Sequence, residues 1–208
     1  MTRPPMTTFR QNGQQARLKR TFVALEVPQT LLRPLAQVRD RYGRLPYLRW
    51  GLVRDWHLTL LFIGKTLPER VEDIARGLAS VARSFAPLEL SVERLGYAPP
   101  GRPAAMVWVQ LTPTPALDLL AQSVDAAVGA IVAPEDSRAG AVPLPHITLA
   151  RFRERKPVPP SRLVALRAQD LIGTEHIFSR IVLFESVSRG RGEGTTYRPL
   201  ASFRLTNS

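Results

Sequence analysis

The sequence repeats one four-residue pattern, and this repeat constrains the fold more than any other feature. Residues 57–60 read HLTL and residues 146–149 read HITL, so two of the three histidines in the 208-residue chain stand in the same frame. Each copy lies in a segment rich in β-branched and aromatic residues, which is typical of a strand. One copy in each half of the chain predicts two similar lobes related by a pseudo-two-fold axis.

Strand geometry places the histidine and the threonine of each copy on one face, because successive side chains point to opposite faces. His57 and Thr59 therefore lie together, and His146 and Thr148 lie together on the second strand. The apolar residues between them anchor the back of each strand. If the two lobes face each other, two imidazoles and two hydroxyls converge on a single cleft.

The remaining patterns predict strands and helices in a similar order in both halves. Strands are expected at 21–27, 48–64, 88–97, 104–111, 146–152, 176–187 and 197–206, the second of these as a strand pair or one bent strand. Helices are expected at 31–43, 66–85, 114–131 and 161–169. Thr66 with Glu69 forms a capping-box pattern, and Thr114 before Pro115 is an N-cap followed by a first-turn proline.

Residues 20–208 are expected to form a single bilobal domain, preceded by a flexible basic N-terminal extension over residues 1–19. The extension has no apolar segment of the kind found in secretory signals. No apolar run approaches the roughly 20 residues that span a bilayer, so we expect no membrane contact. The chain has no cysteine, which excludes disulfides, a cysteine nucleophile and cysteine-based zinc sites. We expect a cytoplasmic protein.

Arginine dominates a strongly basic composition. The 29 basic and 17 acidic residues give a net charge of +12, and the lysines are Lys19, Lys65 and Lys156 alone. The planar guanidinium group suits bidentate contacts to phosphate, and a basic surface favours nucleic acid through the release of counterions. A GC-rich genome, which encodes basic surface positions as arginine, accounts for the same composition.

Paired histidines suit acid–base catalysis because imidazole titrates near neutral pH. One imidazole can deprotonate an attacking hydroxyl or water while the other protonates a leaving oxygen. In-line displacement at phosphorus needs two such groups on opposite sides of the phosphorus atom, and a pseudo-symmetric cleft supplies them without a metal. The threonine hydroxyls can donate to phosphoryl oxygens, and nearby arginines can stabilise the developing charge. The third histidine, His176, has no matching threonine and is expected to be structural.

Other catalytic sites fit the sequence less well. Two histidines and two threonines make a poor zinc site, because catalytic zinc usually has three histidine or carboxylate ligands. We therefore expect no metal and no cofactor. There is no G-x-S-x-G nucleophile elbow and no P-loop sequence.

The twin motifs and their flanking segments resemble the two-histidine (2H) phosphoesterase superfamily. The resemblance rests on "RTFVALEVP", "HLTLLFIG", "PHITLARF" and "FESVSRGRGEGTTYRPLASFRL", and it covers roughly residues 20–205. Within the superfamily the chain looks most like the RNA 2′,3′-cyclic phosphodiesterases, also called bacterial 2′-5′ RNA ligases. This resemblance implies an α/β fold of the α+β type, with two mainly antiparallel sheets facing across a central cleft and helices on the outside.

The resemblance also implies the activity: metal-independent hydrolysis of a 2′,3′-cyclic phosphate to a 2′-phosphate, with reversible 2′-5′ joining of RNA ends. It assigns catalysis to His57 and His146, and phosphate binding to Thr59 and Thr148. Arg151 matches a further phosphate contact, although its alternation is opposite to that of His146, so a bulge or strand end must redirect it.

The division of labour between the histidines follows less directly. We expect His57 to protonate the departing 3′ oxygen and His146 to activate water, while the pseudo-symmetry also allows the reverse. Candidate base-stacking residues are Phe62, Trp56 and Tyr197, although each also suits packing. The basic residues 151–156, Arg189 and Arg191 are candidates to follow an RNA backbone.

The expected partners are RNA ends with a 2′,3′-cyclic phosphate, or cyclic nucleotides, bound by a monomer. Two alternatives stay open. One is another 2H enzyme that acts on a different cyclic phosphate or on an oligoadenylate. The other is a non-catalytic module that keeps the fold and only holds RNA ends.

Overall fold

The computed structural model describes residues 18–99, 104–132, 144–153, 163–190 and 194–207. Its strands are β1 (Lys19–Glu26), β2 (Leu48–Trp50), β3 (His57–Thr66), β4 (Leu88–Ala98), β5 (Met106–Leu111), β6 (His146–Phe152), β7 (Glu175–Phe178), β8 (Arg180–Ser188) and β9 (Thr195–Arg204). Its helices are α1 (Gln29–Tyr42), α2 (Arg70–Arg83) and α3 (Pro115–Gly129). Because β1 begins at Lys19, the expected boundary between residues 19 and 20 falls inside a strand, and residues 1–17 lie outside the description.

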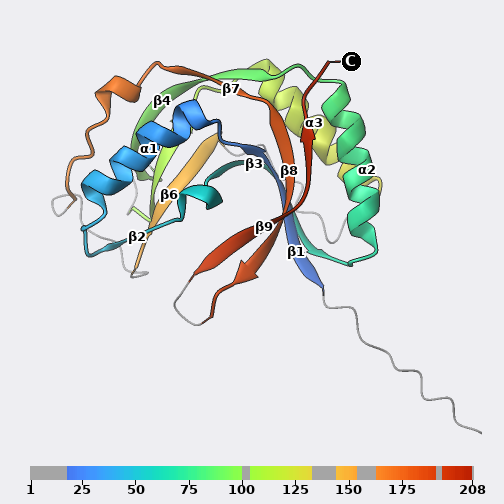
Figure 1. Ribbon diagram of the computed structural model, residues 1–208, viewed down its shortest axis with the longest axis horizontal. Coiled ribbons are helices and arrows are strands. Elements are labelled where there is room, and N and C mark those ends of the chain that lie inside the picture. The colour runs from blue at the N-terminus through green and yellow to red at the C-terminus, as the bar shows by residue number, and fades with distance from the viewer. Residues whose placement is uncertain (1–17, 100–103, 133–143, 154–162, 191–193, 208) are drawn as a thin grey trace, which may run out of the picture.

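The strands form two antiparallel lobes that meet at the two motif strands (Figure 1). One lobe has the order β3-β1-β8-β9, and the other has the order β6-β5-β4-β7 with β2 also paired to β6. In the described residues β3 and β6 pair at one position, Leu58 with Ile147. The expected bilobal α+β architecture is confirmed.

Each half of the chain contributes an inner strand to the sheet of the other half. The third strand from the seam is β8 in the sheet of β3 and β1, and β4 in the sheet of β6 and β5. Each half also has a helix between its first strand and its motif strand, because α1 and β2 lie between β1 and β3 in the chain and α3 lies between β5 and β6. The fold is therefore a duplication in which the two copies interlock.

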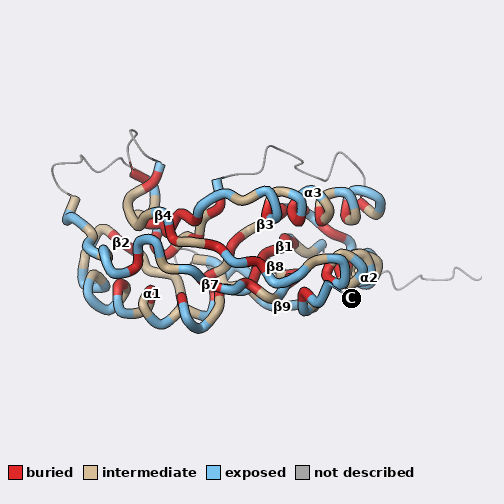
Figure 2. Tube along the Cα trace, turned by 90° about the horizontal axis from the view of Figure 1, so that it is seen from above, coloured by how far each residue is buried: buried red, intermediate tan, exposed pale blue. Residues whose placement is uncertain are grey.

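The helices cover the sheets with the apolar faces that the sequence predicts. In α1 the buried residues are Leu31, Leu35 and Val38, and α3 begins at an N-cap where Thr114 Oγ1 accepts a hydrogen bond from Leu117 N at 3.2 Å. Helices α2 and α3 lie side by side at one end, and α1 lies at the other (Figure 1). Buried residues follow the central strands and the inward sides of the helices (Figure 2).

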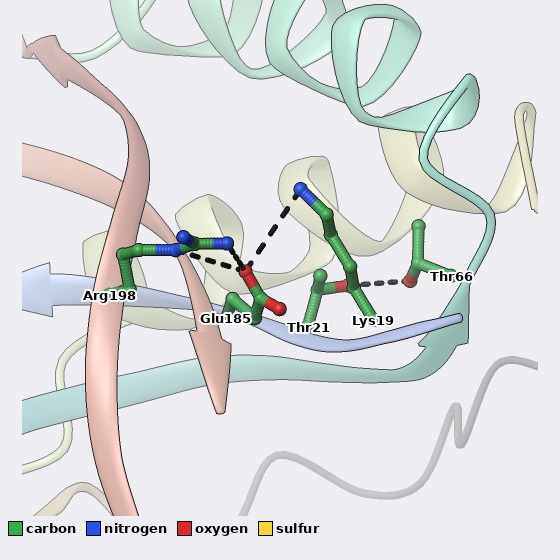
Figure 3. Close-up of polar contacts among 5 residues, drawn as sticks. All are labelled: Lys19, Thr21, Thr66, Glu185 and Arg198. Atoms are coloured by element: carbon green, nitrogen blue, oxygen red, sulfur yellow. Dashed lines mark hydrogen bonds and ion pairs between the residues drawn. The ribbon is translucent and has the colours of Figure 1, made fainter. Parts of the chain in front are cut away.

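The capping box expected at Thr66 is wrong. Thr66 is the last residue of β3, and its hydroxyl lies 2.6 Å from the hydroxyl of Thr21 in β1, buried between the strands (Figure 3). Helix α2 starts later, at Arg70, and Glu69 caps it without a side-chain hydrogen bond. The hydrogen bond between Thr66 and Thr21 across the β1–β3 ladder thus takes the place of the helix cap expected for Thr66. Nearby, Glu185 of β8 contacts Lys19 of β1 and Arg198 of β9 (Figure 3), a partly exposed cluster that contributes about 1 kcal/mol or less.

The helix expected at 161–169 is also wrong over its described residues, 163–169. The segment is irregular up to a 3-10 turn at Gln169–Leu171. Its backbone groups bind tyrosine hydroxyls, because Val164 N donates to Tyr47 Oη at 3.2 Å and Arg167 N donates to Tyr42 Oη at 2.8 Å. These side chains replace the hydrogen bonds that a helix would make within itself.

Two of the expected long strands are divided. Residues 176–187 separate at Ser179 into β7, which pairs with β4, and β8, which pairs with β1 and β9, so the chain crosses from one sheet to the other. The segment at 48–64 forms two separate strands, not one bent strand, and the two do not pair with each other in the described part of the chain. A 3-10 turn at Val53–Asp55 separates β2 from β3, and both pair with β6. This turn lies directly before the first histidine.

Candidate active site between the lobes

A pocket of about 470 Å³ opens at the seam between the lobes. Both copies of the motif line it, with His57 and Thr59 from β3 and His146 and Thr148 from β6. Its other walls are β2, the turn before β3, and the ends of β8 and β9. The two strand faces therefore meet at one site, as the alternation of the motifs predicts.

The two imidazoles are held in the same orientation by their own backbone. His57 Nδ1 lies 2.7 Å from the carbonyl oxygen of Asp55, and His146 Nδ1 lies 2.7 Å from that of Leu144. A carbonyl oxygen only accepts, so in both rings Nδ1 carries the proton and donates it. Nε2 is left as the nitrogen for the cleft, and in the neutral ring it can accept a proton.

Aromatic side chains surround His57. Its ring centroid lies 4.7 Å from that of Phe22, 4.8 Å from that of Tyr197 in an edge contact, and 5.8 Å from that of Phe184. This burial lowers the pKa of His57 from 6.5 to about 4, against the opposing effects of the Asp55 carbonyl and charge. His57 is therefore neutral at pH 7.

A different set of groups supports His146. Its ring lies 4.9 Å from the ring of Trp108, which the Arg94 guanidinium overlies at 5.9 Å. Arg94 Nε donates to Gln110 Oε1 at 2.8 Å, and Gln110 stands opposite His146 in the β5–β6 ladder. The two imidazoles share an orientation but not an environment.

Each motif strand has one extra residue just after its threonine. In the β1–β3 ladder the pairing skips Leu60, and in the β5–β6 ladder it skips Leu149. Such a bulge shifts the alternation of every residue that follows. Phe62 and Arg151, which simple alternation would turn away from the motif face, consequently line the pocket. The bulge that Arg151 requires is present in β6, and the corresponding bulge in β3 turns Phe62 into the pocket.

Asp55 fixes the turn before His57 to the other side of the pocket. Its buried carboxylate accepts from Thr196 Oγ1, with both oxygens at 3.1 Å, and from Tyr197 N at 3.4 Å. The carbonyl of the same residue holds His57. Asp55 was not among the residues selected from the sequence, because its partners lie in β9, far along the chain. Its place two residues before a motif histidine was the one available signal.

Comparison with known proteins decides the family. Residues 27–188 match the sequence profile of the 2′-5′ RNA ligase superfamily. The chain belongs to this superfamily. Its resemblance to the LigT-like 2H phosphoesterases is thereby confirmed.

A curated protein, the RNA 2′,3′-cyclic phosphodiesterase of Geobacillus stearothermophilus, is 28% identical to this chain over 192 residues. The match covers 90% of this chain but only 58% of that protein, so the chain spans little more than half the length of this relative. The protein TT0787 of Thermus thermophilus has a similar structure, with a TM-score of 0.75 and 25% identity, covering 89% of this chain and 97% of that one. E. coli LigT in its apo form has a TM-score of 0.68 at 21% identity, over 91% and 99% of the two chains.

The candidate stacking residues of this superfamily member differ in exposure. Phe62 is 56% exposed and Tyr197 is half-buried against His57, and both line the pocket. Trp56 is only 5% exposed, and its indole N–H donates to the Leu149 carbonyl at 3.3 Å. The ring of Trp56 is thus used for packing, and little of it is left for a base.

The candidate backbone-tracking residues are only partly described. Arg151 and Arg189 line the pocket, whereas residues 154–156 and Arg191 lie outside the described residues. Arg49, which no sequence argument selected, also lines it. His176 lies away from the pocket. Its Nδ1 is 3.0 Å from Thr30 Oγ1 and its Nε2 is 2.9 Å from Thr174 Oγ1, contacts of the kind expected for a structural histidine.

Among the residues that the structure describes, no group of three or more histidine, cysteine, aspartate or glutamate side chains is arranged to hold a metal ion. No helix among them is long and apolar enough to cross a membrane.

Proposed function

We propose that the protein hydrolyses 2′,3′-cyclic phosphates at RNA ends to 2′-phosphates, and joins RNA ends by a 2′-5′ bond in the reverse direction. One observation carries the proposal: two imidazoles, each fixed by a carbonyl two residues earlier, share one pocket with their paired threonines. The curated name of the Geobacillus relative supports this reaction and substrate.

The environment of His57 favours one division of roles. A ring with a pKa of about 4 is neutral at pH 7 and has its free electron pair on Nε2, so it suits a base. His57 then takes a proton from water as the water oxygen bonds to phosphorus. His146 Nε2 gives a proton to O3′ as the P–O3′ bond breaks. This is the reverse of the assignment favoured from sequence.

The two motif threonines and Arg151 are proposed to bind the phosphate. Thr148 Oγ1 donates to Met106 Sδ at 3.5 Å, and thioether sulfur is a weak acceptor. A phosphoryl oxygen in its place would accept a stronger hydrogen bond. Thr59 occupies the equivalent place on β3. Burial lowers the pKa of His57 and raises that of Tyr197, and the charge of Arg151 acts on both groups as a smaller downward influence. This proximity supports a role for Arg151 beside the reacting phosphate.

The decisive experiment follows a 2′,3′-cyclic nucleotide by ³¹P NMR. The wild-type protein should give the 2′-phosphate, with and without EDTA, and His57→Ala and His146→Ala should each lower turnover at least about 100-fold, as expected for lost acid–base catalysis. His176→Gln, which removes the third histidine, serves as the matched control and should keep turnover. A 3′-phosphate product, or full activity in both alanine variants, would refute the mechanism.

Related measurements separate the alternatives. Turnover of an oligoadenylate or another cyclic phosphate in preference to RNA ends would favour a different 2H activity, and RNA binding without turnover would favour a binding module. We also propose that the protein acts as a cytoplasmic monomer, because a single chain supplies both histidines. Light scattering of the eluted protein tests the monomer.

A further inference from the structure

Three arginines gather at one end of the pocket. Arg49 comes from β2, Arg151 from β6 and Arg189 from the residue after β8. Arg49 and Arg151 stand directly opposite each other in the antiparallel β2–β6 ladder. Side chains opposite each other in such a ladder share one face, with their Cβ atoms about 5 Å apart. The two guanidinium groups can therefore reach neighbouring groups of one ligand.

The β8–β9 connection brings the third arginine to the same place. Arg189 N donates to the Gly194 carbonyl at 3.0 Å, and a methyl group on Gly194 would lie 3.3 Å from Cζ of Arg49. The backbone of this connection thus approaches the Arg49 guanidinium closely. Gly194 has a φ of 88°, so both its backbone conformation and its neighbour favour glycine.

Two of the arginines at this end of the pocket, Arg151 and Arg189, have no carboxylate partner among the described residues. Among the described residues that line the pocket, Asp55 is the one carboxylate, and it accepts hydrogen bonds from Thr196 and Tyr197. Neither Arg151 nor Arg189 forms an ion pair with any carboxylate in the described part of the chain. Arg151 and Arg189 thus bring two cations without a carboxylate partner to one pocket, an arrangement that favours binding of more than one negative charge. A cyclic phosphate carries only one.

We propose that Arg49 and Arg189 form a second phosphate subsite, which binds the internucleotide phosphate next to the cyclic one. Arg151 stands between this subsite and the histidines. The protein then selects an RNA chain over a cyclic mononucleotide by its backbone charge. This inference rests on the proposed function, since it takes the histidine end of the pocket as the place of the terminal phosphate.

The test compares three substrates: adenosine 2′,3′-cyclic phosphate, its 5′-phosphorylated form, and the dinucleotide ApA with a terminal 2′,3′-cyclic phosphate. For the wild-type protein we expect kcat/KM to be at least about tenfold higher for the dinucleotide than for the mononucleotide, as for one charge-assisted contact. Equal activity of the 5′-phosphorylated mononucleotide and the dinucleotide would reassign the subsite to a terminal 5′-phosphate and overturn the internucleotide assignment.

Two variants and a control locate the effect. Arg49→Gln and Arg189→Gln should each reduce kcat/KM for the dinucleotide about tenfold more than for the mononucleotide, and should lower the salt dependence of log kcat/KM by about one unit of slope. Arg83→Gln removes the same charge from the exposed end of α2 and should change neither substrate. Equal losses on both substrates in both pocket variants would overturn the subsite, and melting temperatures identify a variant that has merely lost stability.

A binding measurement keeps the subsite separate from catalysis. The affinities of ApA and adenosine carrying a 2′-phosphate can be compared by calorimetry whether or not any substrate turns over. Tighter binding of the dinucleotide, reduced by Arg189→Gln, supports the subsite even if the proposed hydrolysis fails. Equal affinities of the two products would reject the subsite even if hydrolysis succeeds.

Discussion

Phe62 and Arg151 occupy equivalent positions, each five residues after a motif histidine, and both turn into the pocket because of a bulge after the preceding threonine. Although the duplicated strands share this geometry, they present an aromatic ring on one side and a guanidinium on the other. The two sides of the pseudo-symmetric pocket are therefore chemically different. We expect the ring to contact a base and the guanidinium to contact phosphate.

Removing the Phe62 ring should weaken substrate binding. Stacking of a base on an aromatic side chain contributes about 1–3 kcal/mol, so Phe62→Ala should raise KM about tenfold or more for a cyclic nucleotide. Phe62→Trp keeps a stacking surface and should retain most of the affinity. An unchanged KM in the alanine variant would show that the exposed ring does not touch substrate.

The pH profile distinguishes the two assignments of the histidines. Because the pKa of His57 is lowered to about 4, a basic His57 would let kcat/KM rise with pH through about 4 and stay high toward neutrality. If His57 were the acid, activity would instead fall as pH rises above about 4, and little would remain at pH 7. Steady-state rates from pH 3.5 to 9 separate these outcomes.

Asp55 should matter for both stability and catalysis. Asp55→Ala leaves Thr196 Oγ1 and Tyr197 N without their acceptor, so the free energy of unfolding should fall by about 1–3 kcal/mol. The negative charge of Asp55 raises the pKa of His57, so its removal should move the acid limb of kcat/KM to lower pH. Asp170→Asn, an exposed charge change, is the control. Full stability in Asp55→Ala would contradict the role of this carboxylate.

Two glycines with positive φ offer a matched pair. Gly173 and Gly194 have φ values of 80° and 88°, so alanine at either should cost about 1–2 kcal/mol in stability. At Gly173 the added methyl has open space, whereas at Gly194 it approaches Arg49. Gly194→Ala alone should therefore also lower turnover of an RNA dinucleotide. Equal activity of the two variants in that assay would argue against the importance of this contact.

The features that the sequence predicted well depend on local patterns. Alternation in the motif strands placed His57 and His146 in one pocket, and helical spacing identified the buried face of α1. Thr114 Oγ1 accepts a hydrogen bond from Leu117 N, three residues further along, as expected for a helix N-cap.

The features that it missed depend on distant partners. Thr66 pairs with Thr21 across a ladder, and the orientation of Phe62 depends on the bulge at Leu60, a residue of β3 that has no partner in β1. The low pKa of His57 arises from rings on β1, β8 and β9, which no local window contains. Asp55 escaped notice for the same reason.

The crossing of β4 and β8 into opposite sheets has a consequence for how such a molecule can be divided. A polypeptide cut between β4 and β5 would give two fragments, each lacking two strands of its own sheet. The first would lack β8 and β9 and carry β2 and β4 of the other sheet, and the second would lack β2 and β4 and carry β8 and β9. Neither fragment would be expected to fold in isolation, but a mixture of both should reassemble.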